Sequence, residues 1–153
     1  LIGLKREVSF EAQAAMLLEM AVDMSRTKAD DLYHGAIPDK AMTGAIPIAP
    51  LIRAIVADIK AGTALSAMAT RFHRTLGELF VRAARAAREN FGINTVGLSG
   101  GVFQNVYFFE LMVERLREER FTVLTHRLVP TNDGGLALGQ VAIADALIRG
   151  RKD

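Results

Sequence analysis

The amino-acid sequence predicts an α/β fold that is rich in helices and contains a small, mainly parallel sheet. Apolar residues recur at helical spacing through most of the first ninety positions. The last sixty residues instead alternate between strand-like and helix-like segments, the order found in β-α-β units with parallel strands. No stretch of the 153 residues is long and polar enough to separate domains, so we expect a single domain.

The N-terminal part contains three predicted helices. The first covers residues 10–24, with Ser9 as its N-cap. Pro50 suits the first turn of a second helix over residues 51–61, and Thr63 is placed to cap a long third helix that ends near residue 92. Two short segments between the first and second helices, residues 30–38 and 45–48, are candidate strands.

The C-terminal part contains two predicted strands and two predicted helices. Residues 95–98 form an apolar strand, and residues 104–119 form a helix after a turn that contains two glycines. A second strand covers residues 121–126 and is rich in β-branched side chains. The loop RLVPTNDGG then leads into a closing helix over residues 136–150.

The composition excludes several classes of protein. Nineteen basic and seventeen acidic residues give a net charge of only +2, which is not the charge pattern of a nucleic-acid-binding protein. No apolar run is long enough to span a bilayer. The chain has no cysteine, so disulfides and thiolate chemistry within it are excluded, and we expect a reducing, cytoplasmic compartment. Because the chain begins with Leu1 rather than methionine, we also expect it to be a piece of a longer polypeptide.

The stretch LSGGVFQN places Gly100 and Gly101 between a strand and a helix, with Asn105 at the start of that helix. Glycines at this point allow a ligand to approach the backbone, and a helix start offers unpaired N–H groups to a phosphate. No lysine follows the glycines as a P-loop requires. From the residues alone, a plain turn and a phosphate-binding loop both remain open.

The stretch VPTNDGGLALGQ places Asp133 immediately before two glycines and a helix. Asn132 or Asp133 can cap that helix, and a carboxylate at this position can also be an oxygen ligand of a metal ion. Glu11 lies in the first turn of the first predicted helix, where a solvated side chain is the simplest interpretation. The three histidines have no spacing typical of a metal site, and no catalytic triad or carboxylate pair is evident.

Four segments, SFEAQAAMLLE, RFHRTLGELF, LSGGVFQN and VPTNDGGLALGQ, occur in this order and at separations that together resemble the C-terminal part of the HypF carbamoyltransferases. The resemblance covers nearly the whole chain, and the two glycine-containing segments are its specific part. It extends more weakly to O-carbamoyltransferases and to TsaD. It implies the helix-rich C-terminal lobe of an actin/Hsp70-like ATPase fold.

The resemblance also implies a chemistry. HypF-like proteins mature [NiFe]-hydrogenases: they form carbamoyl-adenylate from carbamoyl phosphate and ATP and transfer the carbamoyl group to the C-terminal cysteine of HypE. The implied cofactors are ATP with Mg and a divalent metal, iron or zinc, that is shared with a preceding lobe. The implied partners are HypE and these small-molecule substrates, with no nucleic acid and no membrane.

Several residues of this sequence match positions to which the family assigns a role. Gly100, Gly101 and Asn105 match family residues beside the nucleotide, Glu11 matches a glutamate near the nucleoside, and Asp133 matches a metal ligand. Ala12 departs from the pattern, because the family usually has glycine there.

The remaining metal ligands of the family, an H-x-x-x-H pair in the preceding lobe, do not occur in this chain. We therefore expect residues 1–153 alone to be inactive. Two alternatives stay open: an O-carbamoyltransferase that acts on a small-molecule hydroxyl, and a non-catalytic ATPase-fold lobe that serves as an interaction surface.

Overall fold

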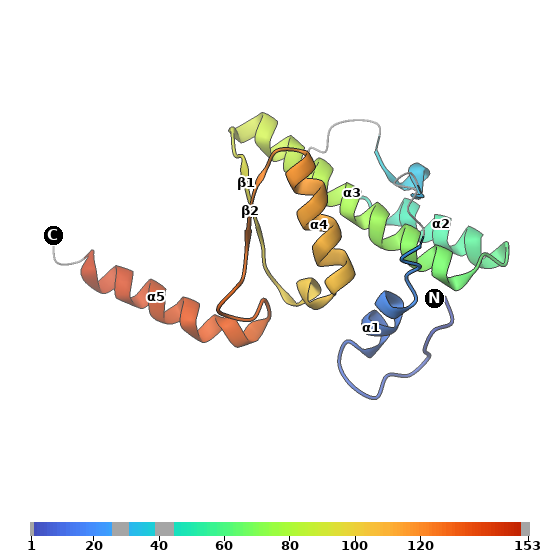
Figure 1. Cartoon of the computed structure of the whole chain (residues 1–153), viewed down its shortest axis with the longest axis horizontal. Coiled ribbons are helices and arrows are strands. Elements are labelled where there is room, and N and C mark those ends of the chain that lie inside the picture. Colours follow the sequence, from blue (N-terminus) through green and yellow to red (C-terminus); the bar gives the residue numbers. More distant parts are fainter. Residues whose placement is uncertain (1, 26–30, 39–44, 151–153) are drawn as a thin grey trace.

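The computed structural model describes residues 2–25, 31–38 and 45–150 (Figure 1). It contains five α-helices, two strands and three short 3-10 helices in these parts of the chain. In chain order they are α1 (Gln13–Met20), η1 (His34–Ala36), α2 (Ala49–Lys60), α3 (Leu65–Phe91), β1 (Thr95–Leu98), η2 (Gly101–Gln104), α4 (Val106–Glu118), β2 (Thr122–Thr125), η3 (Asp133–Gly135) and α5 (Leu136–Arg149).

The two strands form a parallel pair that is connected through α4, which confirms the predicted β-α-β unit. Thr95 lies opposite Thr122, and Leu98 lies opposite Thr125. One face of the pair packs against α4, and α4 packs against the long helix α3 (Figure 1). The core between them is made of six buried apolar side chains: Val81, Leu98, Phe108, Met112, Leu116 and Phe121.

A second, smaller core lies where η1 packs against α2 and α3. Its buried residues are Tyr33, Ala36, Leu51 and Ile55. The backbone N–H of Tyr33 donates to Oγ1 of Thr75 in α3 at 2.9 Å, and the Tyr33 hydroxyl donates to Oδ2 of Asp58 in α2 at 2.8 Å. This segment is therefore tied to two helices at once, and it needs no strand partner to satisfy its backbone.

Both candidate strands in the N-terminal part are wrong. The described residues 31–38 contain η1, and residues 45–48 have no strand structure before α2 begins at Ala49. Pro47 lacks a backbone donor, and no described strand lies beside either segment to form a ladder. The sheet consequently consists of β1 and β2 alone in the described part of the chain.

Two predicted helix caps are also wrong, because their side chains or backbones have other partners. The N–H of Ser9 donates to Oε1 of Gln13 at 2.8 Å, and α1 begins after Ala12. The Thr63 hydroxyl donates to Oδ1 of Asp58 at 3.0 Å, and Ala64 is the residue that precedes α3. The predicted end of the long helix is confirmed, since Gly92 adopts a left-handed φ of 68° there.

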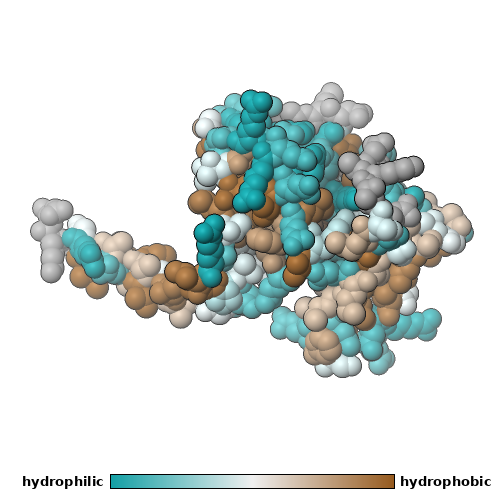
Figure 2. Space-filling view, viewed as in Figure 1, coloured by the Kyte–Doolittle hydropathy of each residue, from teal (hydrophilic) through white to brown (hydrophobic). Residues whose placement is uncertain are grey.

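Helix α5 projects from the body of the molecule and has no buried residue (Figures 1 and 2). Its exposed apolar side chains, at 56–65% exposure, point to more than one side of the helix: Leu136, Leu138, Val141, Ile143, Leu147 and Ile148. A helix that is apolar on most sides is normally covered by other protein. No helix in the described ranges is long and apolar enough to cross a membrane.

Candidate functional site

The two glycine-containing motifs meet at the carboxyl end of the sheet. The N–H of Gly100 donates to the carbonyl oxygen of Thr131 at 2.8 Å. Beside this contact, Nε2 of His126 lies 2.9 Å from Oγ of Ser99. Parallel strands bring their carboxyl ends to one edge, so loops that are distant in sequence become neighbours there. This edge is where open α/β sheets usually bind ligands.

Gly100 is required by its backbone conformation. Its φ of 105° and ψ of 159° belong to a region that side chains other than glycine rarely adopt. A Cβ on Gly100 would have no heavy atom within 4 Å, and one on Gly101 would meet only Oε1 of Gln104 at 4.0 Å. The backbone at these two glycines is therefore open to approach from outside.

Two N–H groups at the start of η2 are available to an anion. Gly101 and Val102 are the first residues of η2, and neither N–H has an acceptor among the described residues. By contrast, the N–H groups of Phe103 and Asn105 donate to Gly100 and Val102 carbonyls. Adjacent unpaired N–H groups at a helix start can bind phosphate or carboxylate oxygens.

The N-terminus of α4, in contrast, is already satisfied from within the chain. Oδ1 of Asn105 accepts from the N–H of Phe108 at 2.7 Å. Oε1 of Glu19, in α1, accepts from the N–H groups of Val106 at 2.7 Å and Tyr107 at 3.2 Å. Any phosphate-binding role of this turn therefore falls to the N–H groups of η2. Sequence reasoning missed Glu19, because its contact spans 87 residues and leaves no local pattern.

Asn105 is held in place by a buried histidine. His73 is only 3% exposed, its Nδ1 lies 2.8 Å from the carbonyl oxygen of Ala69, and its Nε2 lies 2.9 Å from Nδ2 of Asn105. Burial lowers the pKa of His73, opposed by the hydrogen bond to Ala69 and by the charge of Glu19. Burial thus favours the neutral form of the His73 ring.

A pocket of about 510 Å³ lies between α1, α3 and η2. Ala12 lines one side, Gly101 and Asn105 line the other, and His73 and Glu19 contribute polar atoms. The rest of the lining is mainly apolar: Ala15, Met16, Leu18, Phe72, Leu76, Val102, Gln104 and Phe108. The volume and the few polar groups are typical of small-molecule pockets.

The region around Glu11 differs from the predicted helix. Glu11 is exposed and is not among the residues that line the pocket. Ala12 follows it with a left-handed φ of 62°. A glycine at this position, as in the family pattern, would therefore relieve a backbone strain, whether or not it also faces a ligand.

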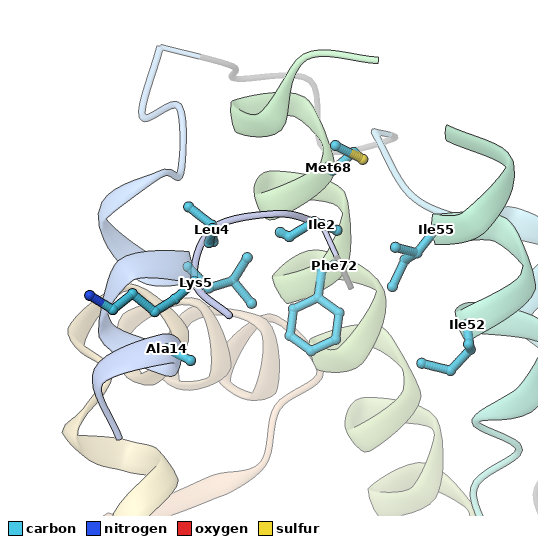
Figure 3. Close-up of a pocket in the computed structure, with 9 residues that line it drawn as sticks. Ile2, Leu4, Lys5, Ala14, Ile52, Ile55, Met68 and Phe72 are labelled. Atoms are coloured by element: carbon cyan, nitrogen blue, oxygen red, sulfur yellow. The ribbon is translucent and has the colours of Figure 1, made fainter. Parts of the chain in front are cut away.

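A smaller hollow of about 250 Å³ lies between the N-terminal segment, α1, α2 and α3 (Figure 3). Leu18 and Phe72 line both cavities. Apart from Lys5, whose ammonium group points away from Phe72 in Figure 3, its lining is apolar. None of the predicted site residues lines it.

Asp133 begins η3, and it is not the residue that caps it. Oδ1 of Asn132 accepts from the N–H of Gly134 at 3.1 Å, so Asn132 caps η3. The predicted cap of the closing helix is wrong, because α5 begins after Gly135 and has no side-chain cap. The exposed carboxylate of Asp133 has no hydrogen bond or ion pair with the described residues, which leaves its oxygens available to a ligand. A Cβ on Gly134 or Gly135 would lie 3.0 Å from an atom of Pro130, so these glycines permit close packing of the loop.

Asp133 alone cannot hold a metal ion. Among the residues that the structure describes, no three histidine, aspartate or glutamate side chains come close enough to form a metal site. A carboxylate oxygen is nevertheless a suitable ligand for Mg²⁺, iron or zinc. A metal site that included Asp133 would therefore need further ligands from outside the described residues.

Comparisons with known proteins agree with this arrangement. A family model described as "Carbamoyltransferase, Kae1-like Domain, second subdomain" matches residues 1–140. The chain belongs to the HypF carbamoyltransferase family. The HypF carbamoyltransferase of Synechocystis is 36% identical over 141 residues, and that of Rhodobacter capsulatus is 35% identical over 140 residues.

The fold agrees with a solved HypF structure. A crystal structure of full-length HypF in the phosphate- and nucleotide-bound form matches with a TM-score of 0.84 and 35% identity. The match covers 96% of this chain and 19% of that one. The alignments to the Synechocystis and Rhodobacter proteins cover 92% and 90% of this chain and 17% of each relative. The predicted fold class is therefore confirmed, and the chain spans under a fifth of these relatives.

Proposed function

We propose that this chain forms part of a site that makes carbamoyl-adenylate from carbamoyl phosphate and ATP and passes the carbamoyl group to the C-terminal cysteine of HypE. The observation that carries the proposal is the hydrogen bond from Gly100 to Thr131. It joins the two motifs that the family resemblance assigns to nucleotide and metal. Family membership supports the carbamoyltransferase class.

In this proposal the pocket beside Asn105 takes the nucleoside, and the N–H groups of Gly101 and Val102 donate to phosphate oxygens. In this proposal the apolar pocket walls exclude water, which would otherwise hydrolyse the carbamoyl-adenylate. Asp133 supplies one oxygen ligand to a divalent metal, whose chemistry is to neutralise phosphate charge. Glu11 precedes Ala12, which lines the pocket, and the proposal assigns Glu11 a position near the nucleoside.

The proposed reaction starts with the hydrolysis of carbamoyl phosphate, in which water breaks the bond to phosphate and yields carbamate and inorganic phosphate. Two steps follow. A carbamate oxygen attacks the α-phosphorus of ATP, and pyrophosphate leaves with the electrons of the broken P–O bond. The cysteine thiolate of HypE then attacks the carbamoyl carbon, and AMP leaves. The acceptor must be a reduced thiol, so we place the reaction in the cytoplasm.

Pyrophosphate release tests the proposal. The intact polypeptide that contains residues 1–153 is supplied with ATP, magnesium and carbamoyl phosphate, with and without HypE. We expect release that depends on carbamoyl phosphate, and a loss of about 100-fold in Asp133→Asn, the size of effect seen when one charge-stabilising group is removed. Glu110→Gln, an exposed position on α4, removes the same charge and should retain at least half of the rate. Pyrophosphate release that does not depend on carbamoyl phosphate would contradict the proposal.

The same assay separates the alternatives. The first alternative is a lobe that only binds partners, in which the N–H groups at the start of α4 are hydrogen-bonded within the chain and take no ligand. In that case Asp133→Asn should leave the function of the intact protein unchanged. If a small-molecule hydroxyl is the acceptor, carbamoyl transfer should proceed without HypE. Residues 1–153 alone should release no pyrophosphate, because their described part holds no complete metal site and leaves the apolar sides of α5 uncovered.

A further inference from the structure

The hydrogen bonds around His73 determine which of its nitrogens carries the proton. The Ala69 carbonyl can only accept, so Nδ1 of His73 must be the protonated nitrogen. Oδ1 of Asn105 accepts from the N–H of Phe108, which identifies the other end of the amide as the NH₂ group. That NH₂ can only donate, so Nε2 of His73 must be unprotonated and accept from it.

We propose that His73 is a positioning residue, which fixes the amide orientation of Asn105 at the pocket wall by accepting a hydrogen bond at Nε2. This inference rests on the proposed function only for its consequence, namely that the fixed amide faces the nucleotide. Both residues line the pocket of about 510 Å³. His73 thus acts through Asn105, and it is not assigned a contact with the reacting atoms.

The surroundings of His73 keep the ring in one orientation. Phe72 and Tyr107 make edge contacts with it, with ring centroids 5.4 and 5.5 Å away, and Phe108 lies 6.4 Å away. Glu19, from α1, is the charged group that acts on it, and the neighbouring Arg74 on α3 donates to the Tyr107 hydroxyl at 3.3 Å. The ring is closely packed and both of its nitrogens are hydrogen-bonded, so it has no alternative orientation with other hydrogen-bond partners.

Protonation would break this arrangement. In the imidazolium form, the Nε2–H of His73 would face the NH₂ group of Asn105, and two donors cannot bond to each other. The Asn105 amide would have to turn over, which removes Oδ1 from the N–H of Phe108. The orientation of Asn105 therefore depends on a neutral His73, and burial favours that form by lowering the pKa of His73.

The test compares three variants of the intact polypeptide by calorimetric titration with ATP and magnesium, without carbamoyl phosphate. His73→Phe keeps an aromatic ring but removes the acceptor, and we expect it to bind ATP about fivefold more weakly at pH 7.5, the loss of one net hydrogen bond. His73→Gln offers an acceptor that does not titrate and should recover most of the affinity. His34→Gln, an exposed histidine outside the pocket, should bind like the wild type.

The pH dependence supplies a readout that simple packing would not change. The dissociation constant of the wild type divided by that of His73→Gln should be near one at pH 7.5 and rise as the pH falls through the pKa of His73. Titration of the phosphates affects both proteins and cancels in the ratio. A ratio that stays constant with pH, or wild-type affinity in His73→Phe, would overturn the inference.

Nuclear magnetic resonance of ¹⁵N-histidine-labelled protein separates this inference from the proposed function. The His73 signal is assigned by its absence in His73→Gln, and it should show the tautomer with the proton on Nδ1 at pH 7.5. If no form of the protein binds ATP but this tautomer is observed, the proposed function fails and the positioning of Asn105 stands. An Nε2–H tautomer, or a charged ring at pH 7.5, would refute the positioning role itself.

Discussion

Replacing Ala12 with glycine should stabilise the start of α1. Ala12 has a φ of 62° and a ψ of 0°, which places it in the left-handed region. This conformation costs a residue with a Cβ about 1–2 kcal/mol, whereas glycine adopts it freely. Glycine loses more freedom on folding, at a cost of about 0.5–1 kcal/mol. The difference is a net gain of about 0.8 kcal/mol, equivalent to roughly a fourfold change in an equilibrium constant.

Amide hydrogen exchange in α1 measures this gain where it acts. Helix α1 has no buried residue, so its amides are expected to exchange by local opening rather than by global unfolding. Protection factors in α1 should therefore rise about fourfold in Ala12→Gly, in proportion to the local free energy. A global melting temperature would be insensitive to so local a change.

Ala15→Gly is the matched control. Ala15 lies within α1 and also lines the pocket, but it has a helical conformation. Glycine in a helix interior costs about 0.8–1 kcal/mol relative to alanine, so protection should fall about fourfold. The same substitution three residues apart thus has opposite expected effects. A fall in both variants would refute the argument that backbone strain at Ala12 explains the family's glycine.

Two further predictions concern stability. Gly100→Ala should lower the free energy of unfolding by about 2 kcal/mol in urea titrations, because alanine is strained at a φ of 105°. The control is Gly97→Ala, which is equally uncrowded but has no positive φ and should change the free energy of unfolding very little. Equal effects of the two substitutions would contradict the strain argument. The Arg85 hydrogen bond lowers the pKa of Glu119 below its usual 4.5. A group whose pKa is lower in the folded state adds stability at pH values above its unfolded-state pKa, and this stability is lost as the pH falls through the folded-state pKa. Glu119→Gln should therefore make the free energy of unfolding less dependent on pH below about pH 4.5. An unchanged pH dependence in this acid range would refute the role of Glu119.

The sequence predicted the C-terminal half of the fold well, because its signals there are local. Alternating apolar residues, a glycine turn and β-branched runs are enough to place β1, α4 and β2. The caps were predicted less well. Ser9 and Thr63 have the right chemistry to cap helices, but their partners, Gln13 and Asp58, are decided by tertiary packing.

The candidate site was predicted unevenly for the same physical reason. Gly100 and Gly101 follow from a motif, and the structure adds that a positive φ requires the first of them. The sequence did not reveal that η3 lies between Asn132 and α5, because Asn132 and Asp133 are both residue types that cap helices well. His73 and Glu19 act through contacts that span 32 and 87 residues, which no periodicity reveals.

The pocket wall formed by α1 depends on one of these missed residues. No residue of α1 is buried, so apolar packing alone holds it weakly against the rest of the molecule. Glu19 supplies charge-assisted hydrogen bonds to Val106 and Tyr107, and a carboxylate at a helix N-terminus is also favoured by the helix dipole. The motif that contains Glu11 therefore lies beside the pocket because Glu19, eight positions further along, anchors α1 to α4. Ala12 and Ala15 of that motif line the pocket, and the contact of Glu19 with α4 holds them there.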